Sequence, residues 1–507
     1  MISSQKDSFL KAYKKGKNFI PITETWPADL ETPLSTWLKL SGKDSRGVFL
    51  ESVEGGENLG RWSIVATKPL WEAVCHGKEL VKTWNNGKTE IHKGDPFDLL
   101  RDWTKGYNSC LLDDFPSIGQ LYGSWGYELI NQIEPSVPIN KLNKNQIPYG
   151  AWMFFDEIVI FDQIKRCITA LIYADTSHLE KLSIDQIYQN SLDKINNIRN
   201  LMRTPLKEIE FLNWNESESI NIDITSNWKK KEFEDAVISA KEYIRKGDIF
   251  QIVLSQRFKS KVKNEPFNLY RSLRMVNPSP YMAFFDFGSW YLIGSSPEVM
   301  VKAEKNKKNQ IVASVRPIAG TRPRGKDHQQ DLELEKDLLN DPKEIAEHVM
   351  LVDLGRNDLG RVCEVGTVHV NDLMIIEKYS HVMHIVSEVE GVLKDKTDVW
   401  ELLKACFPAG TVTGAPKIRA MQLIKQFEQD ARGPYAGVYG SIDINGALNT
   451  AITIRTMVVV PSDKDTFDVS VQAGAGIVAD SSPSNEYQET VNKAKGILKA
   501  LVCLVPK

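Results

Sequence analysis

The stretch GSIDINGALNTAITIRT, residues 440–456, decides the fold class of this chain. Apolar and polar residues alternate on both sides of the Asn-Gly pair at 445–446, a pattern typical of two half-buried strands joined by a tight turn. Strands joined by so short a connection run antiparallel. Successive side chains of a strand point to opposite faces, so we expect Thr453 and Arg455 to point away from Ile452 and Ile454.

The same signal occurs near the start of the chain. LVKTWNNGKTEIH, residues 80–92, predicts a hairpin in which Asn86-Gly87 supplies the backbone angles of a type I′ turn. Residues 1 to about 203 consist of such short strands and turns. A polar, acidic stretch without period at 204–228 indicates a linker between this first domain and a second one at 229–507. The second begins with a helix that carries Phe233, Val237 and Ile244 on one side and stops at Gly247.

Composition is that of a soluble globular protein, with 42% hydrophobic and 25% charged residues among 507. Because no apolar run approaches the roughly 18 residues of a membrane helix, and the first residues do not resemble a secretory signal, we expect a cytoplasmic protein that does not bind membranes. A net charge of -3 gives no basic surface for nucleic acid. Any anion bound here therefore needs local positive groups.

The cysteines favour neither disulfides nor a zinc site, because all six stand singly without a C-x-x-C pair. We expect buried, reduced thiols at Cys75, Cys110, Cys167, Cys363, Cys406 and Cys503.

Two glycine-rich segments resemble nucleotide-binding motifs but lack the flanking residues and secondary structure that such motifs require. GAGIVA, residues 474–479, satisfies G-x-G-x-x-A, yet the next helix starts only at Pro483 and no later strand completes a Rossmann unit. GTVTGAPK, residues 410–417, lacks the spacing and the Lys-Ser/Thr ending of a phosphate loop. The glycines at 474 and 476 are more simply explained by close approach of the backbone to a ligand.

Two helices each carry a Glu-x-x-Glu pair. NDPKEIAEHVMLVDLGRND, residues 340–358, begins with the cap Asp341 and then carries Glu344 and Glu347. This helix is apolar nearly all round, so we expect it to be buried and its acids to need a cation, a metal or the helix N-terminus as partner. SPSNEYQETVNKAKG, residues 482–496, is capped by Ser482 and aligns Glu486, Glu489 and Lys493, a stripe that alone is more typical of a solvated face than of a site. Together, the pairs suggest a hard, oxygen-liganded cation such as magnesium.

Eight ordered motifs then reveal a resemblance. From about residue 225 to 500 the chain resembles the chorismate-utilising enzymes, and the segments LESVEGGENLGRWS (50–63) and NPSPYM (277–282) make it similar to the component I family of anthranilate synthases. The resemblance implies an α/β fold of the α+β type, with large antiparallel β-sheets stacked as a sandwich and helices outside. The eight motifs are GDIFQIVLSQRF, GSSPEVMV, RPIAGTRPRG, AEHVMLVDLGRND, FPAGTVTGAPK, ITIRT, QAGAGIVADS and EYQET.

The resemblance also implies the site. Mg²⁺ would bind Glu347 and Glu489, with Glu344 and Glu486 nearby as ligands through water, so the terminal stripe is expected to be functional. Glu298 would be the acid that protonates the departing hydroxyl, His384 would act in the elimination of pyruvate, and Thr411 would orient the ligand. Contacts to chorismate would come from Gly320, Thr321, Tyr435, Arg455, Gly474, Ala475, Gly476 and Lys493.

Two positions separate related activities. Gln251 stands where hydroxyl-installing relatives use a lysine to activate water, and Ala319 stands where aminodeoxychorismate synthase has a lysine nucleophile. The resemblance therefore implies a carbon–oxygen lyase that makes anthranilate, in the first committed step of tryptophan biosynthesis. Component I of aminodeoxychorismate synthase stays open as an alternative.

The resemblance further implies feedback inhibition by tryptophan at Ser52, Pro280, Tyr281 and Met282. A protein that binds tryptophan without turnover is the alternative from another class. No cysteine has the G-x-C-x-G surroundings of a glutaminase nucleophile, so we expect ammonia to come from a separate glutamine amidotransferase subunit, in a hetero-oligomer.

Overall fold

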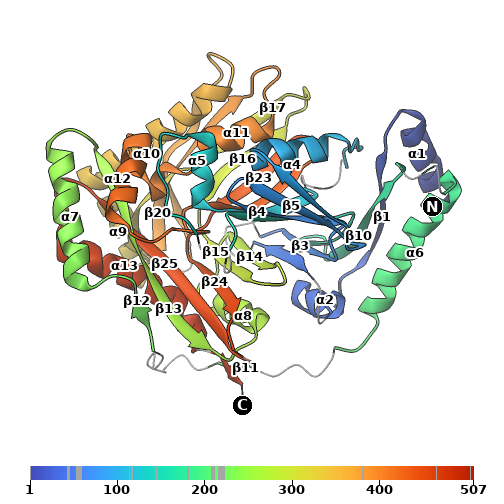
Figure 1. Cartoon of the computed structure of the whole chain (residues 1–507), viewed down its shortest axis with the longest axis horizontal. Helices are drawn as coiled ribbons and strands as arrows, with labels where there is room; N and C mark the ends of the chain where they lie inside the picture. Colours follow the sequence, from blue (N-terminus) through green and yellow to red (C-terminus); the bar gives the residue numbers. More distant parts are fainter. Residues whose placement is uncertain are drawn as a thin grey trace.

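Two large antiparallel sheets form the frame of the molecule (Figure 1). The computed structural model describes residues 2–42, 46–52, 60–112, 115, 118–142, 147–177, 179, 182–206, 212–214, 223–379, 382–463, 465–502 and 504–506. The first sheet has the order β1 (Phe19–Pro27), β10 (Cys167–Asp175), β9 (Glu157–Asp162), β3 (Trp62–Thr67), β2 (Gly47–Glu51), β14 (Tyr281–Asp286), β15 (Tyr291–Ser296), β24 (Thr456–Pro461), β25 (Phe467–Ile477), β13 (Gln251–Val262) and β12 (Thr225–Ser226), with β21 (Gly414–Ala415) also on β13.

The second sheet has the order β18 (Ile318–Pro323), β20 (Val382–Val392), β17 (Ile311–Val315), β16 (Val299–Lys305), β23 (Ala447–Ile452), β22 (Val438–Asp443), β7 (Leu121–Trp125), β8 (Gly150–Phe154), β4 (Trp71–His76), β5 (Glu79–Trp84) and β6 (Thr89–Lys93). A further strand, β19 (His369–Lys378), also pairs with β20. A separate small pair joins β11 (Leu212–Trp214) to β26 (Leu504–Pro506).

Both sheets continue across the two predicted domains. In the first sheet β2 pairs with β14, with Glu51 opposite Met282. In the second sheet β7 pairs with β22, with Gly123 opposite Gly440. The segment expected to be an unstructured linker also contributes the short strands β11 and β12. The first and second parts of the sequence are therefore joined by strand pairing at two seams.

Helices cover the outer faces of the sheets. On the first sheet lie α1 (Ile2–Lys14), α2 (Pro33–Leu40), α6 (Ile184–Met202), α8 (Pro266–Val276) and α13 (Pro483–Leu498). On the second sheet lie α9 (His328–Asn340), α10 (Pro342–Val362) and α11 (Val399–Cys406). The remaining helices are α4 (Pro96–Lys105), α5 (Ile130–Ile133), α7 (Lys230–Arg245), α12 (Lys417–Phe427) and the short η1 (Tyr127–Leu129), η2 (Gly410–Val412) and η3 (Lys499–Leu501).

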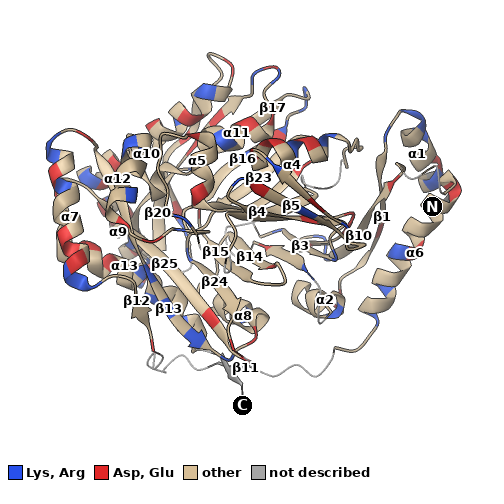
Figure 2. Ribbon diagram, in the orientation of Figure 1, with Lys and Arg blue, Asp and Glu red and all other residues tan. Residues whose placement is uncertain are grey.

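The largest apolar cluster lies between the two sheets. It combines Trp71 and Trp152 of the second sheet with Phe285 and Leu292 of the first, all fully buried. Lysine, arginine and acidic residues alternate along the helices, as Figure 2 shows for α7 and α13. The predicted fold class, stacked antiparallel sheets with helices outside, is confirmed. Within the described ranges, no helix is long and apolar enough to cross a membrane.

Both predicted hairpins form, but their turns differ from the prediction. Gly87 and Gly446 have φ angles of 83° and 93°, whereas Asn86 and Asn445 do not have positive φ. The amide of Gly446 donates to the carbonyl of Asp443 at 3.0 Å. A type I′ turn requires positive φ at both central residues, so these are longer turns in which only glycine takes the left-handed conformation.

The apolar composition of helix α10 predicts that it is buried on all sides, but the structure shows that it is not. Asp341 caps it through the amides of Lys343 and Glu344, as expected. Leu351 and Val352 are buried, but Val349 remains 43% exposed. The helix packs on the second sheet with one side only, so apolar composition overestimates its burial.

Smaller expectations are corrected as well. Ser482 occupies the N-cap of α13, yet its side chain makes no capping hydrogen bond. The described cysteines are all free, but Cys110 and Cys167 are only half-buried. Cys503 lies outside the described residues. In α7, Phe233 and Val237 are fully buried, in agreement with the predicted apolar side.

Candidate functional site

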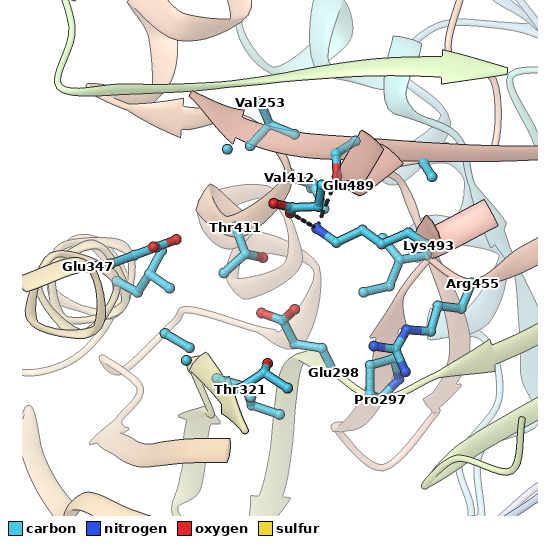
Figure 3. A pocket seen from close by; sticks show the side chains of 18 of the residues that line it. Val253, Pro297, Glu298, Thr321, Glu347, Thr411, Val412, Arg455, Glu489 and Lys493 are labelled. Carbon is cyan, nitrogen blue, oxygen red and sulfur yellow. Dashed lines mark hydrogen bonds and ion pairs between the residues drawn. The ribbon is translucent and has the colours of Figure 1, made fainter. Parts of the chain in front are cut away.

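A cavity of about 500 Å³ lies where strands of both sheets meet helices α10 and α13 (Figure 3). Its walls come from eight parts of the sequence that the fold brings together: the start of β13, residues 297–298, strand β18, His384 of β20, the turn at 411–412, Tyr435, residues 454–455 and the end of β25. Helix α10 completes it with Lys343, Glu344 and Glu347, and helix α13 with Glu486, Glu489 and Lys493. Segments separated by more than two hundred residues thus form one site.

Most of the residues expected from the family resemblance line this one cavity. They are Glu298, Gly320, Thr321, Glu344, Glu347, His384, Thr411, Tyr435, Arg455, Gly474, Gly476, Glu486, Glu489 and Lys493. Ala475 is the exception, because its side chain is fully buried in the cluster that includes Phe233. Along β25, residues 474 and 476 face the cavity and residue 475 faces away.

The two Glu-x-x-Glu pairs come from different helices and line the same cavity. Glu347 accepts a hydrogen bond from Gln251 Nε2 at 3.2 Å, and Glu489 forms an ion pair with Lys493 at 2.7 Å. Burial raises the pKa of Glu344, and the charge of Glu347 raises it further. Burial also raises the pKa of Glu486, and Glu489 contributes to that rise. A cation placed beside Glu344 and Glu486 would favour their charged forms and so oppose this rise.

The residues present fit a divalent cation with oxygen ligands. Buried Oε2 of Glu486 has no hydrogen-bond partner, so one ligand atom is available. All four side chains are carboxylates, the ligand type that magnesium prefers. In the part of the chain that the structure describes, however, no three acidic, histidine or cysteine side chains form a ready-made metal cluster. The expected four-carboxylate cage is therefore open, and closing it would require side-chain rotation.

Glu298 has the properties of a buried acid. It is 8% exposed, and burial raises its pKa from 4.5 to about 7, although Thr411, Arg455 and Lys493 oppose the shift. Figure 3 shows its carboxylate between Thr411 and Arg455. A carboxyl group that keeps its proton near neutral pH can protonate a leaving group.

His384 is arranged as a neutral base. Its Nδ1 lies 3.0 Å from the carbonyl of Gly320 and 3.1 Å from the hydroxyl of Thr321. Because a carbonyl only accepts, we assign the ring hydrogen to Nδ1, which leaves Nε2 with a free lone pair. Burial lowers the pKa of His384, so the neutral form dominates near pH 7. The ring can therefore take up a proton at Nε2.

Three cationic side chains line the cavity, those of Lys343, Arg455 and Lys493. Lys493 Nζ donates to the carbonyl of Gly474 at 3.0 Å besides its ion pair with Glu489. Arg455 has a φ angle of 49° and follows the end of β23, so the expected strand alternation does not extend past Ile452. Ile454 and Arg455 consequently both line the cavity, where alternation would have placed them on opposite faces.

Glycines in β25 leave room for the side chains opposite. A Cβ atom at Gly474 would lie 2.5 Å from the hydroxyl of Tyr435 and 2.8 Å from Val253. A Cβ atom at Gly476 would lie 2.7 Å from Gln251 Nε2. These glycines are required for the positions of Tyr435 and Gln251, whereas the close approach to a ligand expected from the sequence stays a prediction.

Some residues of the site were missed by sequence reasoning. Gln472 and Val253 line the cavity, and both could have been found by period two from Gly474 and Gln251 on their strands. Lys343 also lines it, beside Glu344, and no sequence pattern distinguishes it from a solvated lysine.

The residues expected to bind tryptophan lie at the seam of the first sheet. Ser52 directly follows Glu51, which is the register partner of Met282. Met282 is buried, and the carbonyl of Tyr281 accepts a hydrogen bond from the hydroxyl of Tyr439 at 2.7 Å. Pro280 is buried next to them. Two segments 230 residues apart in sequence are thus adjacent in space.

Comparisons with known proteins agree with this geometry. Residues 54–499 match the family model of the chorismate binding enzymes. Anthranilate synthase component 1 of Synechocystis is 50% identical over 99% of this chain and 100% of its own length. The corresponding protein of Acetivibrio thermocellus is 42% identical over 97% of each.

Solved structures with a similar fold belong to related enzymes. The crystal structure of anthranilate synthase component I from Streptococcus pneumoniae has a TM-score of 0.74 and 35% identity, covering 93% of this chain and 98% of that one. The menaquinone-specific isochorismate synthase of Escherichia coli, 17% identical with a TM-score of 0.67, covers 99% of each chain and shares the fold. The chain therefore belongs to the chorismate binding enzymes.

Proposed function

We propose that this chain is the component I of an anthranilate synthase, which converts chorismate and ammonia into anthranilate and pyruvate with the help of Mg²⁺. The observation that carries the proposal is that Glu298 and His384 line the same cavity, Glu298 as a protonated acid and His384 as a neutral base. The same cavity presents Gln251 and Ala319 at the two positions where related activities use lysine.

Chorismate carries two carboxylates, and the cavity supplies positive groups for them. Arg455 can bind one carboxylate with two parallel hydrogen bonds, and the ammonium of Lys493 lies nearby as a point charge. Magnesium held by Glu347 and Glu489, with Glu344 and Glu486 beside them, would neutralise the other carboxylate. Binding of the dianion thus depends on local charge in a protein of net charge -3.

The chain's own groups account for the proton movements. As the nitrogen of ammonia bonds to the ring, the ring double bonds shift, the bond to the ring hydroxyl breaks, and Glu298 gives its proton so that water leaves. The new ammonium group then returns one proton to the Glu298 carboxylate, which restores the acid. Nε2 of His384 then takes a proton from the ring carbon that bears nitrogen. The bond to the enolpyruvyl oxygen breaks, enolpyruvate takes up a proton to become pyruvate, and the ring becomes aromatic.

The proposal includes a second subunit and an inhibitor. The relatives are named component 1, which supports a partner, and we propose that this partner is a glutaminase that supplies ammonia. We further propose that tryptophan binds at Ser52, Pro280, Tyr281 and Met282. The seam between β2 and β14 supports this, because a ligand there would contact both parts of the chain.

Anthranilate fluorescence tests the function directly. The isolated chain, given chorismate, Mg²⁺ and ammonium, is expected to form a fluorescent product that tryptophan suppresses. An aminated product that keeps its enolpyruvyl ether, seen by mass, would identify an aminodeoxychorismate synthase instead. Tryptophan binding without any turnover would identify a regulatory protein.

A further inference from the structure

A fully buried ion pair lies directly behind the cavity. Arg432 donates to Glu428 from Nε at 2.8 Å and from Nη2 at 2.7 Å, and the two side chains are 1% and 5% exposed. Removing both charges from water costs several kcal/mol per ion, which is offset only when the remaining hydrogen-bonding groups are also satisfied. The further hydrogen bonds of Arg432 and Glu428 therefore show which segments of the chain this ion pair fixes in place.

The remaining donors of Arg432 bind two walls of the cavity. Nη1 donates to the carbonyl of Val412 and Nη2 to the carbonyl of Val253, both at 2.8 Å. Val253 belongs to β13 and Val412 to the turn that carries Thr411, and Figure 3 shows both facing the cavity. Only a guanidinium, with five donors in a fixed plane, can bridge a carboxylate and two carbonyls at once.

Glu428 extends the same contacts to a third wall. Its Oε1 accepts from the amide of Ser255 at 2.8 Å and from the Ser255 hydroxyl at 2.9 Å. The Ser255 oxygen in turn accepts from Nε2 of Gln472 at 2.8 Å, and Gln472 lines the cavity. The ion pair thus fixes β13 against β25 as well.

A residue from the first part of the chain fixes the turn that carries Arg432. The carboxylate of Glu128, in η1, accepts from the amide of Arg432 at 2.7 Å and from the amide of Gly433 at 2.9 Å. Gly433 has a φ angle of 65°, and Tyr435 follows two residues later. The ring of Tyr435 lies 5.5 Å from the guanidinium carbon. The position of Tyr435 in the cavity therefore depends on Glu128.

We propose that Arg432, Glu428 and Glu128 are positioning residues that hold the chorismate pocket in its binding geometry without touching the substrate. The inference rests on the proposed function, because it assigns these residues to the binding of chorismate. It also makes the first part of the chain a structural component of the active site, since Glu128 precedes the linker.

The test compares Glu128→Gln with a matched control. A glutamine at 128 can accept from one amide, but its own NH₂ group then faces the other, so the turn at 432–433 is released. Asp162 is the control, because it also accepts from two backbone amides, those of Ile164 and Lys165, and pairs with Arg61, yet it does not line the cavity. Asp162→Asn removes the carboxylate charge and its ion pair with Arg61, while its Oδ1 can still accept from both amides, so it reports the structural effect of neutralising a carboxylate away from the cavity.

Each variant is examined by calorimetric titration with chorismate and Mg²⁺, by steady-state kinetics and by thermal unfolding. We expect Glu128→Gln to raise the Kd and KM for chorismate about tenfold, with the KM for ammonium unchanged. Arg432→Lys keeps the charge but cannot make the four hydrogen bonds, so we expect it to weaken chorismate binding in the same way. Asp162→Asn is expected to lower Tm without changing Kd or KM.

Two results would overturn the inference. One is a folded Glu128→Gln protein that binds chorismate as the wild type does while its Tm falls as much as that of Asp162→Asn. The other is an Arg432→Lys protein with wild-type Kd and KM. Failure of the proposed function would give a different result, because the wild type would then bind chorismate without forming anthranilate. The comparison of Kd values would still decide the role of these residues.

Discussion

Replacing Glu298 by glutamine is expected to remove activity and yet to stabilise the protein at alkaline pH. The folded carboxyl group keeps its proton until about pH 7, whereas the unfolded chain ionises near pH 4.5. Between these values the folded state binds more protons than the unfolded state, so stability falls as pH rises. The difference between the two pKa values corresponds to roughly 3 kcal/mol of folding free energy, lost in full above pH 7.

A glutamine is always neutral and nearly isosteric, so Glu298→Gln does not suffer this loss. We expect the variant to be more stable than the wild type by roughly 3 kcal/mol at pH 8, with the gain shrinking to less than about 1 kcal/mol at pH 5. Urea unfolding at both pH values measures it. Turnover should fall about 10²- to 10⁴-fold, the usual contribution of a general acid.

The control is Glu304→Gln, at an exposed position on the neighbouring strand β16, where no such pH-dependent gain is expected. A stability gain that does not change with pH would show that Glu298 is not a buried, protonated acid. Wild-type turnover in Glu298→Gln would remove it from the mechanism.

Three further predictions concern the metal, the pocket wall and the inhibitor site. Glu489→Gln should weaken Mg²⁺ affinity about 10- to 100-fold and reduce turnover, while tryptophan binding by calorimetry stays intact; normal magnesium dependence would refute the ligand assignment. Gly474→Ala should raise the KM for chorismate at least about tenfold, because the new methyl group would overlap Tyr435, whereas Gly496→Ala, in open space on α13, should leave KM unchanged and stabilise by about 0.5–1 kcal/mol. Tyr439→Phe removes the hydrogen bonds of its hydroxyl to the Ser296 amide and the Tyr281 carbonyl, so unfolding free energy should fall by about 2 kcal/mol and tryptophan inhibition should weaken; unchanged inhibition would exclude coupling through this hydroxyl.

Sequence patterns correctly predicted those structural features that are determined by residues close together in the chain. The Asn-Gly pairs located two hairpins, and helical spacing located the start of α10 and its two glutamates. The failures lie where a distant contact decides the outcome. One side of α10 is exposed because the second sheet covers only the other. Arg455 departs from strand alternation because β23 ends at Ile452. No local sequence pattern predicts that this strand ends there.

The buried ion pair was beyond prediction for the same reason. Arg432 and Glu428 are four residues apart, a spacing that normally indicates a solvated pair on a helix surface. Their burial depends on Glu128, Val253 and Val412, and nothing in the sequence indicates that these three residues meet Arg432 in space.

Under the proposed function, this arrangement would let an open set of carboxylates and cations select one substrate. Glu489 and Lys493 are each nearly half exposed on α13, so rotation of their side chains costs little. The opposite wall is held by Arg432, whose side chain is 1% exposed and makes four hydrogen bonds. Charge can therefore rearrange around an incoming dianion and its metal on one side, while the other side keeps a fixed shape. Selectivity for the ring should accordingly be sensitive to changes behind Tyr435, and metal affinity to changes on α13.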